Sequence, residues 1–367
     1  MTVLLLVAGL VLLVVGGELL VRGASGLGRA VGLSPLVVGA TVVATATSAP
    51  ELAVSVDATL SGSPGLAVGN AVGSNTVNIL LVLAVAALVR PQRGDRSLLR
   101  FDLPVALGFA AAVVVLGLDG DLGRGDGALL AVGLVGYLAA AVVRGRRAGA
   151  GGAGAAGDGA DEEAGSTDPR PGRDVVVLLA GVGLLVLGAT WLVESASTIA
   201  AALGLSELVI GLTVVSVGTA LPEIVTAVLA ARKGDTELAV GNVIGSNVAN
   251  IGLVLGVPAL VVPGGVGVDP AVVRFDAPVM IAATVALGIV LYTGARVSRP
   301  EGAVLLAWFV AYTAYLVLDG TDHDALGPFS AVLLWFCLPV SLVAAVGFAV
   351  REVRAGRRAG ARGQRSP

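Results

Sequence analysis

Two pairs of matching sequence blocks constrain the fold of this chain more than any other feature. GLSPLVVGATVVATATSAPEL at 32–52 matches GLSELVIGLTVVSVGTALPEI at 204–224, and LAVGNAVGSNTVNI at 66–79 matches LAVGNVIGSNVANI at 238–251. Within both pairs the second block follows the first by 172 residues. RFDLPV at 100–105 and RFDAPV at 274–279 match at a shift of 174 residues. Many matched positions are Ser, Asn, Gly, Pro and Glu, so shared apolar composition does not explain them. The chain contains an internal duplication.

Each copy lies among long apolar runs. The sequence is 56% hydrophobic and only 13% charged, with a mean hydropathy of +0.93, whereas a soluble domain carries about 25% charged residues. A helix of roughly 20 apolar residues spans a bilayer. We therefore expect an all-α polytopic membrane protein and exclude an ordinary soluble enzyme. The eleven runs are 3–21, 35–60, 66–89, 103–118, 127–143, 175–194, 207–231, 238–262, 275–293, 302–318 and 328–350.

The duplication covers about five spans in each half. Because five is an odd number, the second copy must cross the membrane in the opposite direction to the first. Such inverted-topology repeats are typical of secondary transporters, whose substrate site lies near the midplane between the repeats. We expect a first repeat at 1–143, a flexible cytoplasmic linker at 144–173 and a second repeat at 174–320. An eleventh transmembrane helix and an Arg-rich cytoplasmic tail would occupy 321–367.

Basic residues are distributed unevenly among the expected loops. With the N-terminus outside, all 23 Lys and Arg residues except Arg124 and Arg274 fall on the cytoplasmic side, as the positive-inside rule requires. Arg22 and Arg29 are expected in the first such loop. This orientation places the C-terminus in the cytoplasm and favours a plasma (inner) membrane. The first apolar run has no preceding basic residues, so it is interpreted as a transmembrane helix and not as a cleaved signal peptide.

Glu51 and Glu223 occupy equivalent positions, each directly after a proline within an apolar span. A carboxylate at membrane depth is costly and marks a functional site. Pro50 and Pro222 each remove a backbone donor, so we expect both helices to break and to free carbonyl oxygens that line a cavity or an ion.

The second repeated block places polar groups on one helical face, because its Asn and Ser residues recur every four positions. The repeated oxygen donors are hydroxyls and amides, with one His and one Cys in the whole chain. Oxygen ligands suit hard cations such as Ca²⁺, and the scarcity of His disfavours a membrane enzyme with a Ser-His or Cys-His pair. Asn75 and Asn247 are expected to join packed helices. The face consists of Asn70, Ser74 and Asn78 in one copy and Asn242, Ser246 and Asn250 in the other.

These motifs resemble the α-repeats of the cation/calcium exchanger superfamily, and most of all its prokaryotic sodium/calcium exchanger branch. The resemblance rests on TSAPE with GNAVGSNTVN and on GTALPE with GNVIGSNVAN, and its weaker part covers about 1–320. It implies ten core helices in two inverted halves, with ion sites between the second, third, seventh and eighth helices. It also implies that the first and sixth helices slide across this core.

The resemblance further implies a set of ion ligands. Glu51 and Glu223 would bridge Ca²⁺ and also bind Na⁺, both as transported substrates. No cofactor, nucleic acid or obligatory protein partner is implied, and the lipid bilayer is the expected surrounding. The other implied ligands are Thr47, Ser48, Ser74 and Asn78 in the first repeat, Thr219, Ser246 and Asn250 in the second, and the backbone carbonyls near Ala44 and Ser216.

Three positions depart from the family pattern. Ala220 stands where the family often has serine, so one Na⁺ site loses a hydroxyl, while its counterpart Ser48 is retained. Ala46 stands where the second copy has glycine, and we expect it to stiffen the first break. Asn250 stands where potassium-coupled branches have aspartate, which argues against K⁺ co-transport.

The two glutamates bear on the mechanism. If both are ionised, their charge of about −2 is neutralised by one Ca²⁺, whereas three Na⁺ leave about +1, so exchange would respond to voltage by about 2.3 kcal/mol per charge per 100 mV. Two protons also neutralise the pair, so an H⁺/Ca²⁺ or other divalent-cation antiporter of the same fold stays open. A cation channel is less favoured, because channel filters usually come from symmetric rings of subunits.

Overall fold

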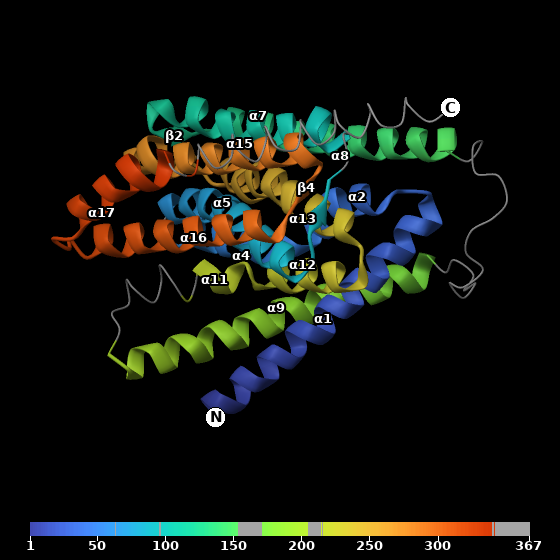
Figure 1. Cartoon of the computed structure of the whole chain (residues 1–367), viewed down its shortest axis with the longest axis horizontal. Coiled ribbons are helices and arrows are strands. Elements are labelled where there is room, and N and C mark those ends of the chain that lie inside the picture. Colours follow the sequence, from blue (N-terminus) through green and yellow to red (C-terminus); the bar gives the residue numbers. More distant parts are fainter. Residues whose placement is uncertain are drawn as a thin grey trace, which may run out of the picture.

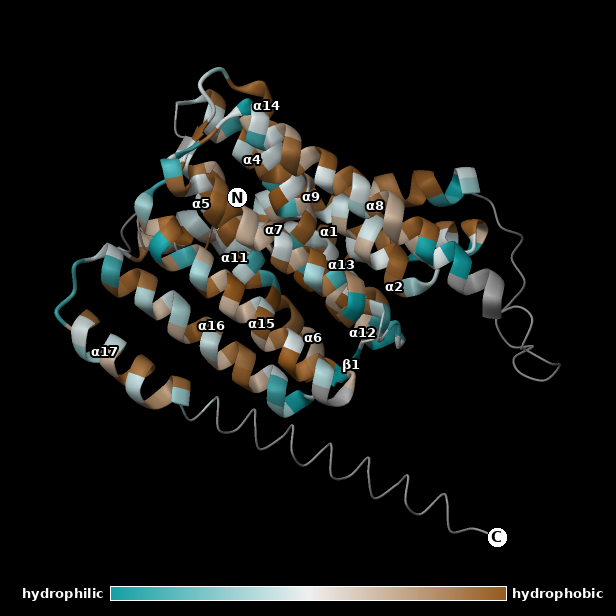
Figure 2. Ribbon diagram, turned by 90° about the horizontal axis from the view of Figure 1, so that it is seen from above, coloured by the Kyte–Doolittle hydropathy of each residue, from teal (hydrophilic) through white to brown (hydrophobic). Residues whose placement is uncertain are grey.

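A computed structural model describes residues 1–62, 64–94, 97–152, 171–204, 214, 216–339 and 341. Within these residues the regular secondary structure is helical, apart from four strands of two residues each. Nine helices of the described part are long and apolar enough to cross a membrane. Figure 2 shows hydrophobic residues along most of their length and hydrophilic residues gathered at helix ends and loops. The chain is therefore an integral membrane protein, as its composition predicts.

The first half of the chain forms five spans. The first span is the uninterrupted helix α1 (Thr2–Val31). The second, third and fourth spans contain short π or 3-10 turns, labelled η, and the fifth is again a single helix. In order they contain α2 (Pro35–Val38), η1 (Gly39–Val43), α3 (Ala44–Thr47) and α4 (Ala49–Leu60); α5 (Pro64–Val77), η2 (Asn78–Val82) and α6 (Leu83–Val89); η3 (Leu98–Asp102), α7 (Leu103–Leu116) and η4 (Gly117–Asp119); and α8 (Arg124–Gly152).

The second half repeats this order, and even the irregular turns recur. The turns that begin at Asn78 and Leu98 have counterparts that begin at Asn250 and Val272. The elements are α9 (Pro171–Ala202); α11 (Ser216–Thr219) and α12 (Leu221–Lys233); α13 (Thr236–Ala249), η6 (Asn250–Leu255) and α14 (Gly256–Val261); η7 (Val272–Asp276) and α15 (Ala277–Gly294); α16 (Arg299–Gly320); and then α17 (Leu326–Val332) and η8 (Leu333–Cys337).

Several helices are longer than the apolar runs that predict them. Arg22 and Arg29 lie within α1, so the expectation that they lie in a loop is wrong. Arg144 likewise lies within α8 and not in the linker. Long arginine stems can cover apolar surface while the charged group reaches water, so a helix continues past the apolar run. The seventh and eleventh predicted spans are described only in part, and most of the linker and the tail at 351–367 lie outside the described residues.

Two small sheets establish that the halves are inverted. Strand β1 (Gln92–Arg93) pairs with β4 (Arg296–Val297), and β2 (Asp121–Leu122) pairs with β3 (Val266–Gly267). β1 and β3 follow the third span of their own halves, whereas β2 and β4 follow the fourth. Each sheet thus joins the end of a third span to the end of the other half's fourth span. Those ends lie on the same side of the molecule only if one half is upside-down relative to the other.

The first helices of the two halves pack together as a separate layer. Figure 1 shows α1 and α9 crossing along one side of the remaining helices. A Cβ atom built on Gly16 would lie 2.9 Å from the backbone oxygen of Gly181, and one built on Gly9 would lie 2.8 Å from that of Gly188. These four positions are also related by the 172-residue shift, so the contact is symmetric. We call Gly9, Gly16, Gly181 and Gly188 the glycine seam, where small residues let two backbones touch.

The third span of each half forms the centre of the molecule. In the most apolar window of residues 65–89 and of 236–261, 78% and 83% of the residues are buried, compared with 28% in α1 and α9. At this centre α13 lies backbone-to-backbone against the second span, because a Cβ atom at Gly245 would overlap the carbonyl oxygen of Ala40. This close approach brings the polar face of α13 next to the end of α3.

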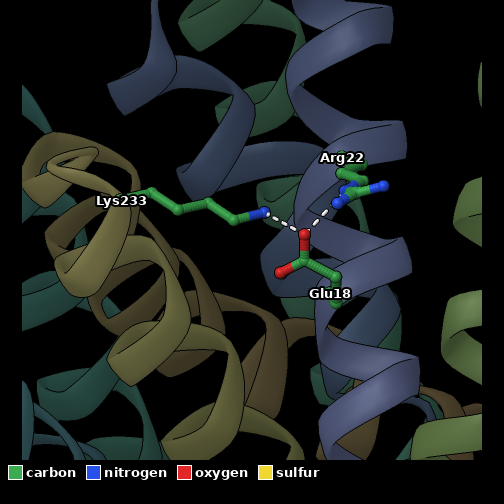
Figure 3. Close-up of polar contacts among 3 residues, drawn as sticks. All are labelled: Glu18, Arg22 and Lys233. Atoms are coloured by element: carbon green, nitrogen blue, oxygen red, sulfur yellow. Dashed lines mark hydrogen bonds and ion pairs between the residues drawn. The ribbon is translucent and has the colours of Figure 1, made fainter.

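An ion pair links the α1–α9 layer to the central helices at one end. One carboxylate oxygen of Glu18 on α1 accepts from Arg22 Nε at 2.6 Å and from Lys233 Nζ at 2.8 Å, at the end of α12 (Figure 3). Glu18 is the acidic partner in both ion pairs found among the described residues. The second half has Thr190 at the position related to Glu18 by the repeat shift, so this link is not duplicated.

Glu18→Gln is expected to lower stability only slightly, because partly exposed ion pairs contribute about 0–1 kcal/mol. Thermal unfolding of the purified protein in detergent would measure the loss. Arg22→Gln is the matched comparison, since it keeps the Lys233 partner and should cost less than Glu18→Gln. A larger loss from Arg22→Gln than from Glu18→Gln would contradict the role of Glu18 as the shared partner of both basic residues.

Candidate ion-binding site

Two equivalent helix breaks position the candidate site. Ser48 has φ −80° and ψ 3°, and Ala220 has φ −83° and ψ 0°. Each residue precedes a helix with proline in its first turn, where the missing backbone donor is tolerated. The predicted breaks are therefore present in both halves.

Ala46 does not change the geometry of the first break, because both breaks have the same backbone angles. A stiffening effect of Ala46 stays a prediction. The glycine at its counterpart, Gly218, has a packing role: a Cβ atom there would overlap Val193 Cγ2 on α9. The absence of a side chain at this position therefore serves close contact with α9 and is not needed for the break itself.

The two glutamates follow these breaks directly. Glu51 and Glu223 lie in the first turns of α4 and α12, and each is only 1% exposed. The carboxylate of Glu223 is near enough to act electrostatically on that of Glu51. One oxygen of Glu51 and both oxygens of Glu223 are buried without a hydrogen-bond partner among the described residues. Buried charges are costly unless they are paired or bind a metal, so this carboxylate pair has the chemistry of a cation site.

Thr47 joins the first break to the second repeat. Its hydroxyl lies 3.3 Å from Asn242 Oδ1 and 3.4 Å from Ser246 Oγ, both on α13. It is also near the Glu223 carboxylate. Three oxygen-bearing side chains from opposite repeats therefore converge beside the glutamates. Asn242 was expected on this polar face but not as a member of the ligand set.

Asn70 has a different role from Asn242. Its Nδ2 donates to the backbone oxygen of Glu51 at 3.1 Å and to Ser55 Oγ at 3.0 Å, so it ties α5 to the helix that carries Glu51. Thr226, one turn after Glu223, is fully buried, and its hydroxyl has no partner among the residues that the structure describes. Ser55 and Thr226 were not expected at the site, although their spacing from the glutamates places them one helical turn away.

Four asparagines connect the third span of one half to that of the other. Asn75 Nδ2 donates to the backbone oxygen of Asn247 at 3.0 Å, and Asn247 Nδ2 donates to that of Asn75 at 3.4 Å. Asn78 Nδ2 donates to Asn247 Oδ1, and Asn250 Nδ2 donates to Asn75 Oδ1, both at 3.1 Å. We call these four residues the asparagine clasp. Asn75 and Asn247 do join packed helices, as expected, and the pattern of bonds is the same in both directions.

The remaining expected ligands are distributed around this centre. Ser48 is buried, with no partner for its hydroxyl within the described part of the chain, and Ser74 is buried on α5. The Ala44 carbonyl accepts from the Ser48 amide at 3.1 Å and from the Thr47 hydroxyl at 3.4 Å, so it is not the free oxygen that the sequence suggests. Thr219 is the last residue of α11 and is half-buried. Ser216 is the first residue of α11, and its side chain is not among those that the structure describes.

Both breaks border one small cavity. It is too narrow to hold a water molecule, and its lining includes Thr47 and Pro50 from the first break, Pro222 from the second, and Leu185 of α9. The cavity lies where the α1–α9 layer covers the two breaks. Among the described residues, no three His, Cys, Asp or Glu side chains gather in one place. The donors are therefore two carboxylates with hydroxyl and amide oxygens, which suit a hard cation better than zinc or copper.

Comparisons with known proteins agree with this chemistry. A family model described as "Sodium/calcium exchanger protein" matches residues 1–143 and 174–318. The Escherichia coli inner membrane protein YrbG is 38% identical over 316 residues, which cover 85% of this chain and 95% of that protein. The sodium/calcium exchanger MaX1 of Methanosarcina acetivorans is 33% identical over 347 residues, covering 85% and 97%. A structure of the sodium-calcium exchanger NCX_Mj has a TM-score of 0.72 at 30% identity, covering 86% of this chain and 98% of that one.

Proposed function

The chain belongs to the sodium/calcium exchanger protein family, and from this premise we propose that it is a secondary-active antiporter that exchanges Ca²⁺ for Na⁺ by alternating access. Its family and its structural neighbours are transporters, not enzymes. The observation that carries the proposal is the pair of buried glutamates, whose unpaired oxygens lie at two equivalent helix breaks.

The charge of this pair supports an electrogenic exchange. Neither glutamate forms an ion pair with a basic residue among the described residues, so the ionised pair carries about −2. One Ca²⁺ neutralises this charge, whereas three Na⁺ leave about +1. A three-for-one exchange therefore moves charge across the membrane, and each 100 mV changes its energy by about 2.3 kcal/mol per charge.

The proposed ligands combine both halves. Glu51 and Glu223 bind Ca²⁺ between them and share Na⁺ with the hydroxyls of Thr47, Ser48, Ser74, Thr219 and Ser246, the amides of Asn78 and Asn250, and the carbonyl of Ser216. The Ala44 carbonyl is left out of this set because it already accepts two hydrogen bonds. The contact of Thr47 with Ser246 supports a site that spans the repeats. An uncharged Asn250 adds no third carboxylate, which supports exchange without K⁺.

We further propose how the protein lies in the membrane. The N-terminus is outside and the C-terminus is in the cytoplasm of a cell with this protein in its plasma (inner) membrane. The repeats at 1–143 and 174–320 are joined by a cytoplasmic linker at 144–173, and 321–367 provides an additional helix and a basic tail. In this proposal the α1–α9 layer moves across the breaks, which is supported by Leu185 of α9 lying against the cavity that both breaks border.

Uptake of ⁴⁵Ca²⁺ by purified protein in liposomes tests the coupling ion. We expect uptake when Na⁺ is loaded inside and diluted outside, and faster uptake when valinomycin and inward K⁺ make the interior positive. Liposomes with equal Na⁺ on both sides are the control. Uptake driven by an outward H⁺ gradient alone would replace Na⁺ with H⁺ as the coupling ion and leave the glutamates in place. Ca²⁺ entry that needs no counter-ion gradient would contradict exchange.

A further inference from the structure

The asparagine clasp forces one orientation on each of its amides. Asn75 Nδ2 faces the backbone oxygen of Asn247, and a backbone carbonyl only accepts hydrogen bonds. The atom of Asn75 in that place must therefore be its nitrogen. Its other terminal atom is then an oxygen, and the group that faces this oxygen, Asn250 Nδ2, must be a donor. In the same way, the backbone oxygen of Asn75 requires the nitrogen of Asn247 to face it, and the Asn247 oxygen then requires the nitrogen of Asn78.

This orientation decides which atom of the ligand amides remains for an ion. An asparagine amide has one acceptor oxygen and one donor nitrogen, and only the oxygen binds a cation. With its nitrogen bonded to Asn75, Asn250 has a buried oxygen with no hydrogen-bond partner in the described part of the chain. If Asn250 turned over, its oxygen would face the Asn75 oxygen, and its NH₂ group would take the place of the ligand atom.

We propose that Asn75 and Asn247 are positioning residues for the ion site. They do not bind the ion, but each holds an asparagine of the opposite repeat so that its oxygen is directed to the cation. Asn75 positions Asn250, and Asn247 positions Asn78. This inference rests on the proposed function, since it assumes that Asn78 and Asn250 are ligands.

The proposal predicts a change in affinity more than in rate. Without the Asn75 oxygen, Asn250 loses the bond that selects its orientation, and a hydrogen bond of this kind is worth about tenfold in an equilibrium. Asn75→Ala and Asn247→Ala should therefore each raise the KM for Ca²⁺ about tenfold, with a much smaller change in kcat. The measurement is ⁴⁵Ca²⁺ uptake into Na⁺-loaded liposomes in K⁺-free buffer, using variants that elute as folded protein from a sizing column.

Aspartate at the ligand positions provides a sharp control. A carboxylate has two oxygens and no NH₂ group, so an oxygen faces the ion in either orientation, although its other oxygen then meets the Asn75 oxygen with no donor between them. Asn75→Ala should therefore not raise the KM further when it is added to Asn250→Asp, because it removes that acceptor–acceptor contact. Added to Asn78→Asp, it should keep its full effect, because Asn78 is held by the other positioning residue. Asn247→Ala should keep its full effect when it is added to Asn250→Asp and lose it when it is added to Asn78→Asp.

Each outcome of these crossed pairs decides between orientation and packing. Equal effects of Asn75→Ala in both aspartate backgrounds would overturn the positioning role, since a packing defect does not depend on which ligand is an acid. If Asn75→Ala does not fold, Asn247→Ala in the same two aspartate backgrounds replaces it, with the roles of Asn78→Asp and Asn250→Asp exchanged. If Asn78→Ala and Asn250→Ala leave the KM unchanged, the ligand set itself is wrong, which is a failure distinct from that of the clasp.

Discussion

Glu51→Gln and Glu223→Gln are each expected to abolish Ca²⁺ exchange in liposomes. Glutamine keeps the shape of glutamate but removes one negative charge and places an NH₂ group at the site. In the proposed site, each glutamate forms a buried ion pair with the bound Ca²⁺. Removing one partner of such a pair costs about 3 kcal/mol or more, which corresponds to a loss of more than about 100-fold in binding. Initial rates of ⁴⁵Ca²⁺ uptake by Na⁺-loaded liposomes measure the effect.

Asp57→Asn is the matched control for these variants. Asp57 lies on the same helix as Glu51, less than two turns further along, but it is exposed. Its neutralisation should leave most of the uptake intact, so a loss confined to the glutamate variants would identify the buried pair and not the overall charge of α4. Near-normal exchange by either glutamate variant would rule out a shared site for Ca²⁺.

Gly181→Leu is expected to prevent stable folding. A Cβ atom at this position would lie 2.5 Å from the backbone nitrogen of Leu20 and 2.8 Å from the backbone oxygen of Gly16. The rest of the leucine side chain has no room unless α1 and α9 separate along the whole glycine seam. Overpacking commonly costs about 1–3 kcal/mol even where side chains can adjust, and here the obstacle is backbone. Sizing-column profiles and thermal unfolding in detergent would show the loss.

Gly183→Leu separates this clash from the general effect of adding a side chain. Gly183 lies two residues away on the same helix, is exposed, and has no described atom within 4 Å of a built Cβ. Leucine there should be tolerated, since lipid contact favours an apolar side chain. Comparable damage from both substitutions would mean that the seam does not determine the packing of α1 against α9.

The sequence was sufficient for the architecture because the relevant signals were local. Pro50 and Pro222 predict the breaks through a missing donor, and the odd number of spans between matching blocks predicts inversion. Helix ends were less accurate: α1 continues to Val31 although its apolar run ends at 21, because arginine stems tolerate a partly apolar environment.

The contacts of individual side chains were less predictable. Spacing separates Asn78, which shares a helical face with Ser74, from Asn75, which was expected to join packed helices. Spacing does not tell which residue of the opposite repeat each asparagine contacts, because those contacts depend on where the two third spans cross. The glycine seam was also missed, since glycines spaced seven residues apart in apolar helices carry no signal until the partner helix is known. The close contact of Gly218 with Val193 was likewise not apparent from the sequence, where the glycine suggested a role in bending.

The paired strands β1–β4 and β2–β3 describe a molecule that is nearly unchanged when it is turned over in the membrane. With two identical copies, turning it over would convert a form open to one side into a form open to the other, and both would have the same energy. Any resting preference for one side must therefore come from positions where the copies differ. Ser48 opposite Ala220 is one such difference, and the unduplicated ion pair of Glu18 with Lys233 is another. A difference of only about 1 kcal/mol shifts the ratio of the two forms about fivefold. A few unmatched side chains are therefore enough to make a nearly symmetric protein favour the form that is open to one side of the membrane.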